Sequence, residues 1–212
     1  MDRYCVEHLT RAGMSVYSEE SGFTSAPIAG HWTVVLDPVD GSTNASREIP
    51  LFVLSCALLH DGELVAGYVH ELTNHSLYWA IRGEGAFWGT NALAHPRGET
   101  NLRSAVVGVN GYPRSYLGWA QYRALGCAAL ELSMVASGQL DAYVDCSKVG
   151  LATWDYLGAL AILREAGCAA KSLGTGLAPE DDVMGPRRHL VAARGNALLE
   201  ELGAAWERSM AP

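Results

Sequence analysis

Apolar residues in the first half of the chain occur in short runs that turn residues separate. One of these runs ends directly at Asp37, as expected of a buried strand that delivers a carboxylate at its end. Asp61-Gly62 predicts a tight turn, which would make the apolar runs on either side of it a hairpin. We therefore expect a helix and then a β-meander, with the helix at residues 2–12 and strands at 34–36, 51–59, 64–70 and 77–81.

The second half of the chain has a different pattern, in which apolar positions recur at helical spacing. A run rich in Ala, Leu and Met ends at Gly138, and another ends at Gly167, which are typical helix ends. The pattern predicts helices at 127–137, 154–166 and 197–208 and strands at 106–109, 141–144 and 189–193. We expect a single domain over residues 1–212, an α/β layered sandwich whose two halves, about 1–105 and 106–212, meet around the site.

Composition narrows the class of protein. The chain has 212 residues and a formal net charge of −8, and its longest basic cluster is Arg187-Arg188, which argues against a nucleic-acid partner. The five cysteines are widely spaced and predict reduced thiols. The chain opens without a basic-then-apolar leader, and its apolar runs are too short for a bilayer. We therefore expect a cytoplasmic protein without a membrane partner.

Acidic residues gather at three places that could carry chemistry. Glu19-Glu20 precedes a Ser-Gly pair, Asp37 and Asp40 flank Pro-Val directly after an apolar strand, and Asp155 opens an apolar helix. Taken alone, the Glu pair is typical of a solvated loop, and an Asp at a helix start is typical of an N-cap. The string Asp37-Pro-Val-Asp-Gly-Ser is different, because open α/β sheets place their sites at strand ends.

Magnesium suits such a set of acids. It prefers hard oxygen ligands and retains several waters, so it needs few carboxylates for each ion. The spacing of two other motifs excludes the sites that they would indicate. His70 and His75 lie five residues apart, so they would not share a helix face as the histidines of a zinc-binding helix do. Gly83-Glu-Gly85 lacks the third glycine of a dinucleotide-binding motif. Converging carboxylates would repel one another unless cations neutralised them.

Ordered motifs along the chain resemble those of the inositol monophosphatase family, within the metal-dependent, lithium-sensitive phosphatases that include fructose bisphosphatase. The resemblance extends over nearly the whole chain, and the family's signature around Asp-Pro-Ile/Val-Asp-Gly-Ser/Thr is its most specific part. The matching segments are Ser18–Gly22, Trp32–Asn44, Gly83–Phe87, Leu125–Ala129 and Trp154-Asp155.

The resemblance implies a layered α-β-α-β-α fold, a homodimer, and two or three Mg²⁺ ions that Mn²⁺ can replace. It implies that Glu19, Asp37 and the Val39 carbonyl bind the first ion, and that Asp37, Asp40 and Asp155 bind the second. Glu20 is similar to a ligand of a third, weaker ion. The family's reaction is in-line attack of a metal-activated water on phosphorus, without a covalent enzyme intermediate.

The catalytic residues implied are Glu19, Asp40 and Ser42, with Ser42 and Glu19 orienting the water. The implied substrate is a small-molecule phosphate ester. Its contacts would come from Asp40, Gly41, Ser42, Thr43, Gly126, Cys127, Ala128, Asp145, Lys148 and Asp155.

The segment near the last metal ligand differs from the family pattern. A family Glu that binds substrate hydroxyls aligns with Asp145 counted from one side and with Lys148 counted from the other. Lys148 could meet a second phosphate or be a solvated loop residue. Both alternatives stay open.

The N-terminal region is also short before Glu19, and Asp2 could be the acid that supports the Ser42 hydroxyl in the family. A short N-terminus could expose apolar surface and promote oligomerisation.

We expect a phosphatase for inositol monophosphate. Alternative substrates are fructose bisphosphate, histidinol phosphate and a nucleotide 3′-phosphate. A different class, a truncated and impaired homologue that acts through protein contacts, is the other alternative.

Overall fold

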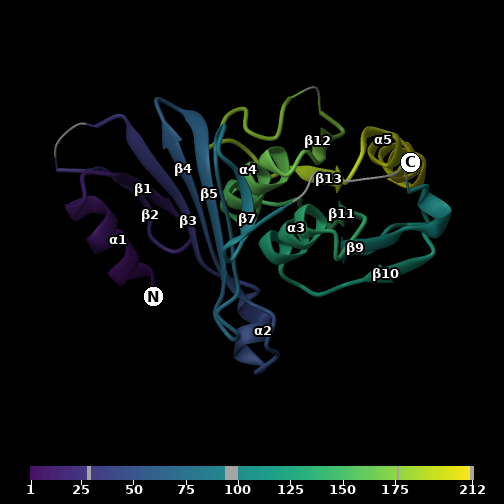
Figure 1. Ribbon diagram of the computed structural model, residues 1–212, viewed down its shortest axis with the longest axis horizontal. Coiled ribbons are helices and arrows are strands. Elements are labelled where there is room, and N and C mark those ends of the chain that lie inside the picture. Colours follow the sequence, from purple (N-terminus) through teal and green to yellow (C-terminus); the bar gives the residue numbers. More distant parts are fainter. Residues whose placement is uncertain (28–29, 94–99, 176, 211–212) are drawn as a thin grey trace.

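Two β-sheets and five α-helices make up the described part of the chain, and Figure 1 shows how they alternate in space. The structure is a computed structural model that describes residues 1–27, 30–93, 100–175 and 177–210. The first sheet has the order β2-β1-β3-β4-β5-β6-β7-β8 and the second β10-β9-β11-β13-β12. The helices are α1 (Asp2–Arg11), α2 (Ser42–Ser46), α3 (Ala128–Ser137), α4 (Leu157–Glu165) and α5 (Asn196–Met210).

The first sheet takes its strands from the first half of the chain. Neighbours from β3 onward are consecutive in sequence and antiparallel, so this part is the predicted meander. The pair β1 and β3 is parallel, in contrast to the other pairs described in this sheet. The strands are β1 (Ser15–Ser18), β2 (Gly22–Thr24), β3 (Trp32–Asp40), β4 (Val53–His60), β5 (Glu63–Glu71), β6 (Leu77–Ile81), β7 (Gly85–Trp88) and β8 (Asn91–Ala92).

The second sheet takes its strands from the second half of the chain. Its strands β10, β9 and β11 are mutually parallel, whereas β13 is antiparallel to both β11 and β12. The parallel strands therefore end at one common edge. The bounds are β9 (Val106–Gly111), β10 (Gln121–Arg123), β11 (Ala142–Cys146), β12 (Ala169–Leu173) and β13 (His189–Ala193).

The predicted layers are confirmed. Helices α3 and α4 lie between the sheets, α1 covers part of the outer face of the first sheet, and α5 covers the outer face of the second (Figure 1). In α4 every residue from Leu157 to Leu163 is buried, as expected of a helix enclosed on several sides. The predicted helix at 154–166 is corrected at its start, because Thr153–Asp155 forms a 3₁₀ turn and α4 begins at Leu157. No helix in the described ranges is long and apolar enough to cross a bilayer.

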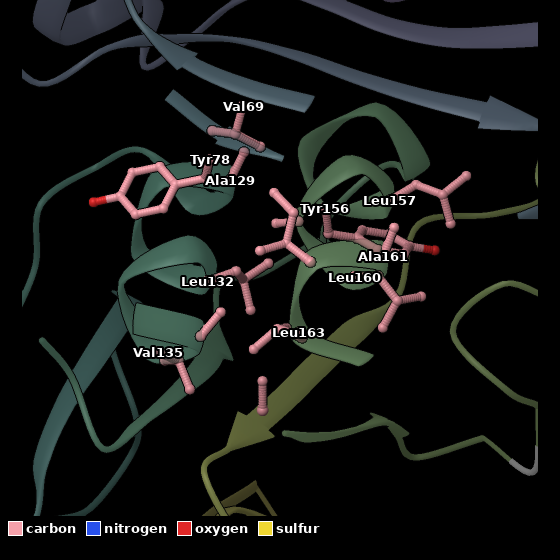
Figure 2. Packing of buried hydrophobic residues seen from close by; sticks show 14 of the residues in the cluster. Val69, Tyr78, Ala129, Leu132, Val135, Tyr156, Leu157, Leu160, Ala161 and Leu163 are labelled. Atoms are coloured by element: carbon pink, nitrogen blue, oxygen red, sulfur yellow. The ribbon is translucent and has the colours of Figure 1, made fainter. Parts of the chain in front are cut away.

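The main core lies where α3 and α4 meet the first sheet. Figure 2 shows Leu132 of α3 close to Leu163 of α4, with Val69 of β5 above them. Tyr78 of β6 is buried among these side chains, and its hydroxyl donates a 2.9 Å hydrogen bond to Gln139, just after α3. The core therefore joins the β-meander to helices from the second half of the chain.

Two glycines let α4 approach the first sheet closely. A Cβ atom added to Gly67 of β5 would lie 2.0 Å from the Gly158 carbonyl oxygen, and one added to Gly158 would lie 2.6 Å from the Cys56 carbonyl oxygen. Side chains at either position would push the helix away from the sheet. The backbones of α4, β4 and β5 therefore depend on glycine at both positions.

An apolar cleft of about 500 Å³ opens on the first sheet beside α1. Leu9 of α1 and Met14 line one side of it, and Tyr68 and Trp79 lie among the residues that line it from the sheet. Its lining is almost entirely carbon.

The close approach of α4 gives a stability prediction. Replacement of Gly67 by alanine should lower the free energy of unfolding by about 1–3 kcal/mol, because the new methyl group forces the helix to shift. The matched control is Gly195→Ala, whose added Cβ would meet nothing within 4 Å. Urea unfolding followed by circular dichroism would measure both variants. Equal stability of Gly67→Ala and the wild type would refute a tight contact.

Candidate active site

A β-bulge at the end of β3 brings Asp37 and Asp40 together. Asp37 pairs with Ser55 and Asp40 with Val53, so β3 carries one residue more than β4 between these pairs. In a regular strand, residues three apart point to opposite faces, and the extra residue cancels this alternation. Pro38 suits the bulge because it has no N–H group to donate to the neighbouring strand. The sequence motif therefore produces two neighbouring acids.

Asp37 is the most deeply buried of the acids predicted to bind metal, with 2 % of its surface exposed. Its carboxylate accepts a 2.9 Å hydrogen bond from the Val39 N–H. Burial raises the pKa of Asp37 well above its usual range, and the charges of Asp40, Glu19 and Asp155 raise it further. These four acids thus share one electrostatic environment.

Asp40 connects the bulge to the start of α3. Its carboxylate accepts a 2.7 Å hydrogen bond from the Ala129 N–H and contacts the Cys127 thiol at 3.3 Å. Cys127 is the N-cap residue of α3, but its side chain makes no capping hydrogen bond. The Asp40 carboxylate, at the end of β3, instead accepts the hydrogen bond of a backbone N–H group in the first turn of α3. Burial raises the pKa of Asp40 to about 7, and the charges of Asp155 and Glu19 add to this.

Asp155 lies in the 3₁₀ turn before α4. Its carboxylate accepts a 2.8 Å hydrogen bond from the Ala152 N–H and forms a 3.5 Å ion pair with Arg187. Asp155 is therefore not the N-cap expected of an Asp at a helix start, because the N-cap of α4 is Tyr156 and that of the 3₁₀ turn is Ala152. The Glu19 charge also acts on Asp155. Burial raises the pKa of Asp155 to about 6, although the Ala152 hydrogen bond and Arg187 oppose the shift.

Glu19 and Glu20 lie in the turn between β1 and β2, and both are exposed. The Glu19 N–H bonds the Leu36 carbonyl next to Asp37, and the Glu19 charge acts on Asp37, Asp40 and Asp155. The Glu20 N–H donates a 3.3 Å hydrogen bond to the Ser18 hydroxyl. The structure therefore brings Glu19 into electrostatic contact with the buried acids, and the metal-binding role of Glu20 stays a prediction.

Asp2 lies against the same turn. Its carboxylate accepts hydrogen bonds from the hydroxyls of Ser18 at 2.6 Å and Ser21 at 3.4 Å. The predicted partner of Asp2 was the Ser42 hydroxyl, and the hydrogen bonds found are to these two serines instead.

The residues after Asp40 form a tight turn into the short helix α2. Gly41 has φ 86°, and a Cβ there would lie 2.8 Å from the Leu51 carbonyl oxygen, so only glycine fits without strain. Ser42 and Thr43 are exposed at the start of α2. Val39 lies within the bulge and is half-buried.

A predicted substrate segment, Gly126 to Ala128, lies beside this turn. The buried Asn44 side chain donates to the carbonyls of Leu51 at 2.8 Å and Leu125 at 2.7 Å, which ties the motif to the segment before α3. Gly126 is exposed, whereas Cys127 and Ala128 are buried. The structure thus places residues 125–127 next to α2.

The two alternatives at the last loop differ in their surroundings. Asp145 is fully buried and accepts hydrogen bonds from Asn110 at 2.8 Å, from Ser147 at 3.1 Å and from His189 at 2.7 Å. Lys148 is exposed. The Asp145 carboxylate is therefore engaged within the protein, and contact of either residue with substrate stays a prediction.

Three residues outside the recognised motifs support the site. Ser55 pairs with Asp37 in the sheet and donates a 3.3 Å hydrogen bond to the Trp154 carbonyl, next to Asp155. Arg187 pairs with Asp155. Glu131, buried in α3, accepts a 3.4 Å hydrogen bond from the Leu125 N–H, and burial raises its pKa to about 8. Their sequence contexts carry no signal of these contacts.

The chemistry of the acids fits a hard divalent cation. They offer carboxylate oxygens that repel one another at partly buried positions, and a cation would relieve this repulsion. Within the described ranges, however, no three His, Cys, Asp or Glu side chains already form a group that could hold a metal ion. The acids are therefore neighbours but not a closed ligand cage.

The fold and site define a layered α/β protein with an acid cluster at the end of a central strand. Residues 3–211 match the model of the inositol monophosphatase family. The chain belongs to this family.

Relatives within the family carry more than one kind of name. The inositol-1-monophosphatase of Mesorhizobium japonicum is 34% identical over 174 residues, which cover 74% of this chain and 62% of the relative. The Nus factor SuhB of Pasteurella multocida is 31% identical over 169 residues, 72% of this chain and 61% of that protein. The chain thus spans about three fifths of the length of these relatives.

Solved structures agree with the fold. The structure of staphylococcal SaIMPase-II with inositol monophosphate bound superimposes with a TM-score of 0.78 at 30% identity, covering 97% of this chain and 80% of the other. The structure of SaIMPase-II with 2′AMP bound gives the same TM-score and identity.

The raised pKa values predict how stability depends on pH without metal. An unfolded Asp has a pKa near 3.9, whereas folded Asp155 and Asp40 have pKa values of about 6 and about 7. The folded chain therefore binds protons more tightly, and these groups should lower the free energy of unfolding as pH rises from about 4 to 7. Denaturant unfolding in a chelator, at several pH values, would measure this effect.

Asp37→Asn is the variant that isolates the effect of a buried carboxylate on the free energy of unfolding. It keeps an oxygen for the Val39 N–H and removes the charge, so it should stabilise the metal-free chain by about 1 kcal/mol or more at pH 8. The gain should disappear towards pH 4. Exposed Glu84→Gln is the control, with no expected change. A pH-independent gain would contradict the electrostatic explanation.

Proposed function

We propose that this chain is a magnesium-dependent phosphomonoesterase that hydrolyses a small polyol phosphate, most simply inositol monophosphate. The observation that carries the proposal is the acid cluster at the end of β3, in which burial and neighbouring negative charges, including that of Glu19, raise the pKa values of Asp37, Asp40 and Asp155. Membership of the inositol monophosphatase family supports it, as does the inositol monophosphate bound by SaIMPase-II.

The acids would hold the metal, with the ligand sets that the family resemblance implies. Asp37 would be shared between two Mg²⁺ ions, Glu19 and the Val39 carbonyl would complete one site, and Asp40 and Asp155 the other. Glu20 would serve a third, weaker ion. Bound magnesium would supply the positive charge that neutralises phosphate oxygens and favours ionisation of water.

The protein groups would orient the reactants. Ser42 and Glu19 would hold the attacking water, and the Gly41 and Ser42 amides would bind the phosphate. Asp40 would fix the start of α3, so that Gly126 to Ala128 would face the alcohol of the substrate. Arg187 would hold Asp155 in place and offset part of its charge.

Further family properties belong to this proposal. Mn²⁺ would substitute for Mg²⁺, lithium would inhibit, and the protein would act in the cytoplasm as a homodimer. A role through protein contacts is a second candidate, which the Nus factor SuhB favours as a relative of similar identity. A nucleotide phosphate is a second candidate substrate, because SaIMPase-II also binds 2′AMP.

Phosphate release from inositol-1-phosphate by the purified chain, with and without Mg²⁺, tests the proposal. We expect release that requires Mg²⁺. The matched assay uses adenosine 3′-monophosphate, fructose bisphosphate and histidinol phosphate. A chain that binds Mg²⁺ weakly in calorimetry and releases no phosphate from any of these esters would instead support the role through protein contacts.

Asp40→Asn tests the role of the acid cluster. The variant should lower kcat by about two orders of magnitude or more, because it removes one charge from the metal site. The fold should survive, since an amide oxygen can still accept the Ala129 N–H. Steady-state kinetics and circular dichroism measure the two effects, with Glu84→Gln as the control. Wild-type activity in Asp40→Asn would overturn the site assignment.

A further inference from the structure

Glu131 is a buried acid in the first turn of α3, just after the segment Leu125–Ala129 that carries a family motif. None of its surface is exposed. Acidic side chains are almost never fully buried unless contacts inside the protein compensate for the loss of water. The contacts of Glu131 therefore indicate what this side chain does.

The Glu131 carboxyl group reaches back past the start of its own helix. Its Oε1 atom accepts a 3.4 Å hydrogen bond from the Leu125 N–H. Burial raises the pKa of Glu131 to about 8, and hydrogen bonds from the backbone N–H groups of Leu125, Cys127 and Gly126 oppose this shift. Three successive donors directed at one carboxyl group restrict the path of the backbone. Residues 125–127 are therefore held from their N–H side.

Asn44 holds the same segment from its carbonyl side. The Asn44 amide donates hydrogen bonds to the carbonyl oxygens of Leu125 at 2.7 Å and Gly126 at 3.5 Å. Asn44 belongs to α2, the helix that follows the Asp37–Ser42 motif. Gly126, at the centre of the segment, has φ 74°, which glycine adopts far more easily than other residues. The segment is thus fixed between α2 and Glu131.

Gly108 of β9 leaves the space that the Glu131 carboxyl group occupies. A Cβ atom at Gly108 would lie 3.0 Å from Glu131 Oε1 and 3.2 Å from the ring of Tyr143, its partner on β11. Within the described part of the chain, Glu131 Oε2 and the Tyr143 hydroxyl are buried without a hydrogen-bond partner. An uncharged carboxyl group costs far less to bury in such surroundings than a charged one. Glu131 therefore offers residues 125–127 an uncharged acceptor.

From these contacts we propose that Glu131 is a positioning residue for substrate binding, which holds residues 125–127 at the distance from α2 that the alcohol portion of the phosphate ester requires. The inference deepens the proposed phosphatase function and rests on it for the class of ligand. Glu131 itself touches neither the phosphate nor a metal ion. Asp40 holds Ala129 of the same helix start from the side of the metal ligands. The two acids therefore fix the start of α3 for different tasks.

Steady-state kinetics of Glu131 variants test the proposal. Glu131→Leu removes the acceptor, so it should raise KM for inositol-1-phosphate about tenfold and change kcat less than about threefold. Glu131→Gln keeps an uncharged acceptor oxygen and should return KM to within about twofold of the wild-type value. The control is Ser133→Ala, which removes another buried polar group of α3, a hydroxyl that bonds the Ala129 carbonyl. It should leave KM unchanged.

Inorganic phosphate separates the two sides of the substrate. As a competitive inhibitor it occupies only the phosphate position, so its inhibition constant should stay within about twofold of the wild-type value in Glu131→Leu. Equal rises in KM and in this inhibition constant would show a general distortion of the site and overturn the proposal. An unchanged KM in Glu131→Leu would overturn it too, as would a raised KM that Glu131→Gln does not restore.

Amide hydrogen exchange of the metal-free chain needs no turnover. Residues 125–127 should exchange about tenfold faster in Glu131→Leu than in the wild type or Ser133→Ala, with the core strand β13 as the internal reference. Unchanged exchange would refute the hold of Glu131 on this segment. Faster exchange in a chain whose wild type releases no phosphate from any ester would support that hold and refute the phosphatase proposal.

Gly108→Ala serves as a second variant where Glu131→Leu does not fold. It leaves Glu131 in the chain and crowds its carboxyl group, so it should also speed exchange at residues 125–127 and raise KM. Wild-type exchange and wild-type KM in a folded Gly108→Ala chain would overturn the proposal.

Discussion

The contact between α4 and the first sheet is the constraint on which the site depends. Gly67 and Gly158 let the helix backbone touch the strands, and the turn that carries Asp155 immediately precedes this helix. Ser55 links the two parts, because it pairs with Asp37 in the sheet and bonds the Trp154 carbonyl. A wider gap between helix and sheet would move Asp155 away from Asp37. The packing of a carbon-rich core therefore sets the distances within a cluster of acids.

The acid cluster shows why such packing is needed. Buried carboxylates that raise one another's pKa oppose folding, so the remaining structure must hold them in place. The hydrogen bonds from Val39, Ala129 and Ala152 each stabilise one carboxylate, and all three come from the backbone. Backbone donors are fixed by the fold itself, so the carboxylates remain oriented when side chains nearby move.

Much of the fold could be predicted from the sequence, because apolar runs and glycine turns mark the meander, α3 and α5. The short edge strands β2, β8 and β10 could not, since pairing with a neighbour defines them more than composition does. Asp37 and Asp40 were recognisable from their motif, but the bulge that unites them depends on register with β4. Ser55 and Arg187 act through contacts between distant segments, which no local pattern encodes. The roles of the proposed metal and substrate residues stay predictions.

The apolar cleft beside α1 has a consequence for how the folded chain behaves towards hydrophobic dyes. Dyes that fluoresce on apolar surface normally report exposed cores in loosened proteins. Here a carbon-lined cleft of about 500 Å³, bordered by Leu9 and Trp79, already offers such a surface in the native state. The folded protein should therefore give a fluorescent signal before any heating, and detergents or lipid tails that enter the cleft would compete for the same surface.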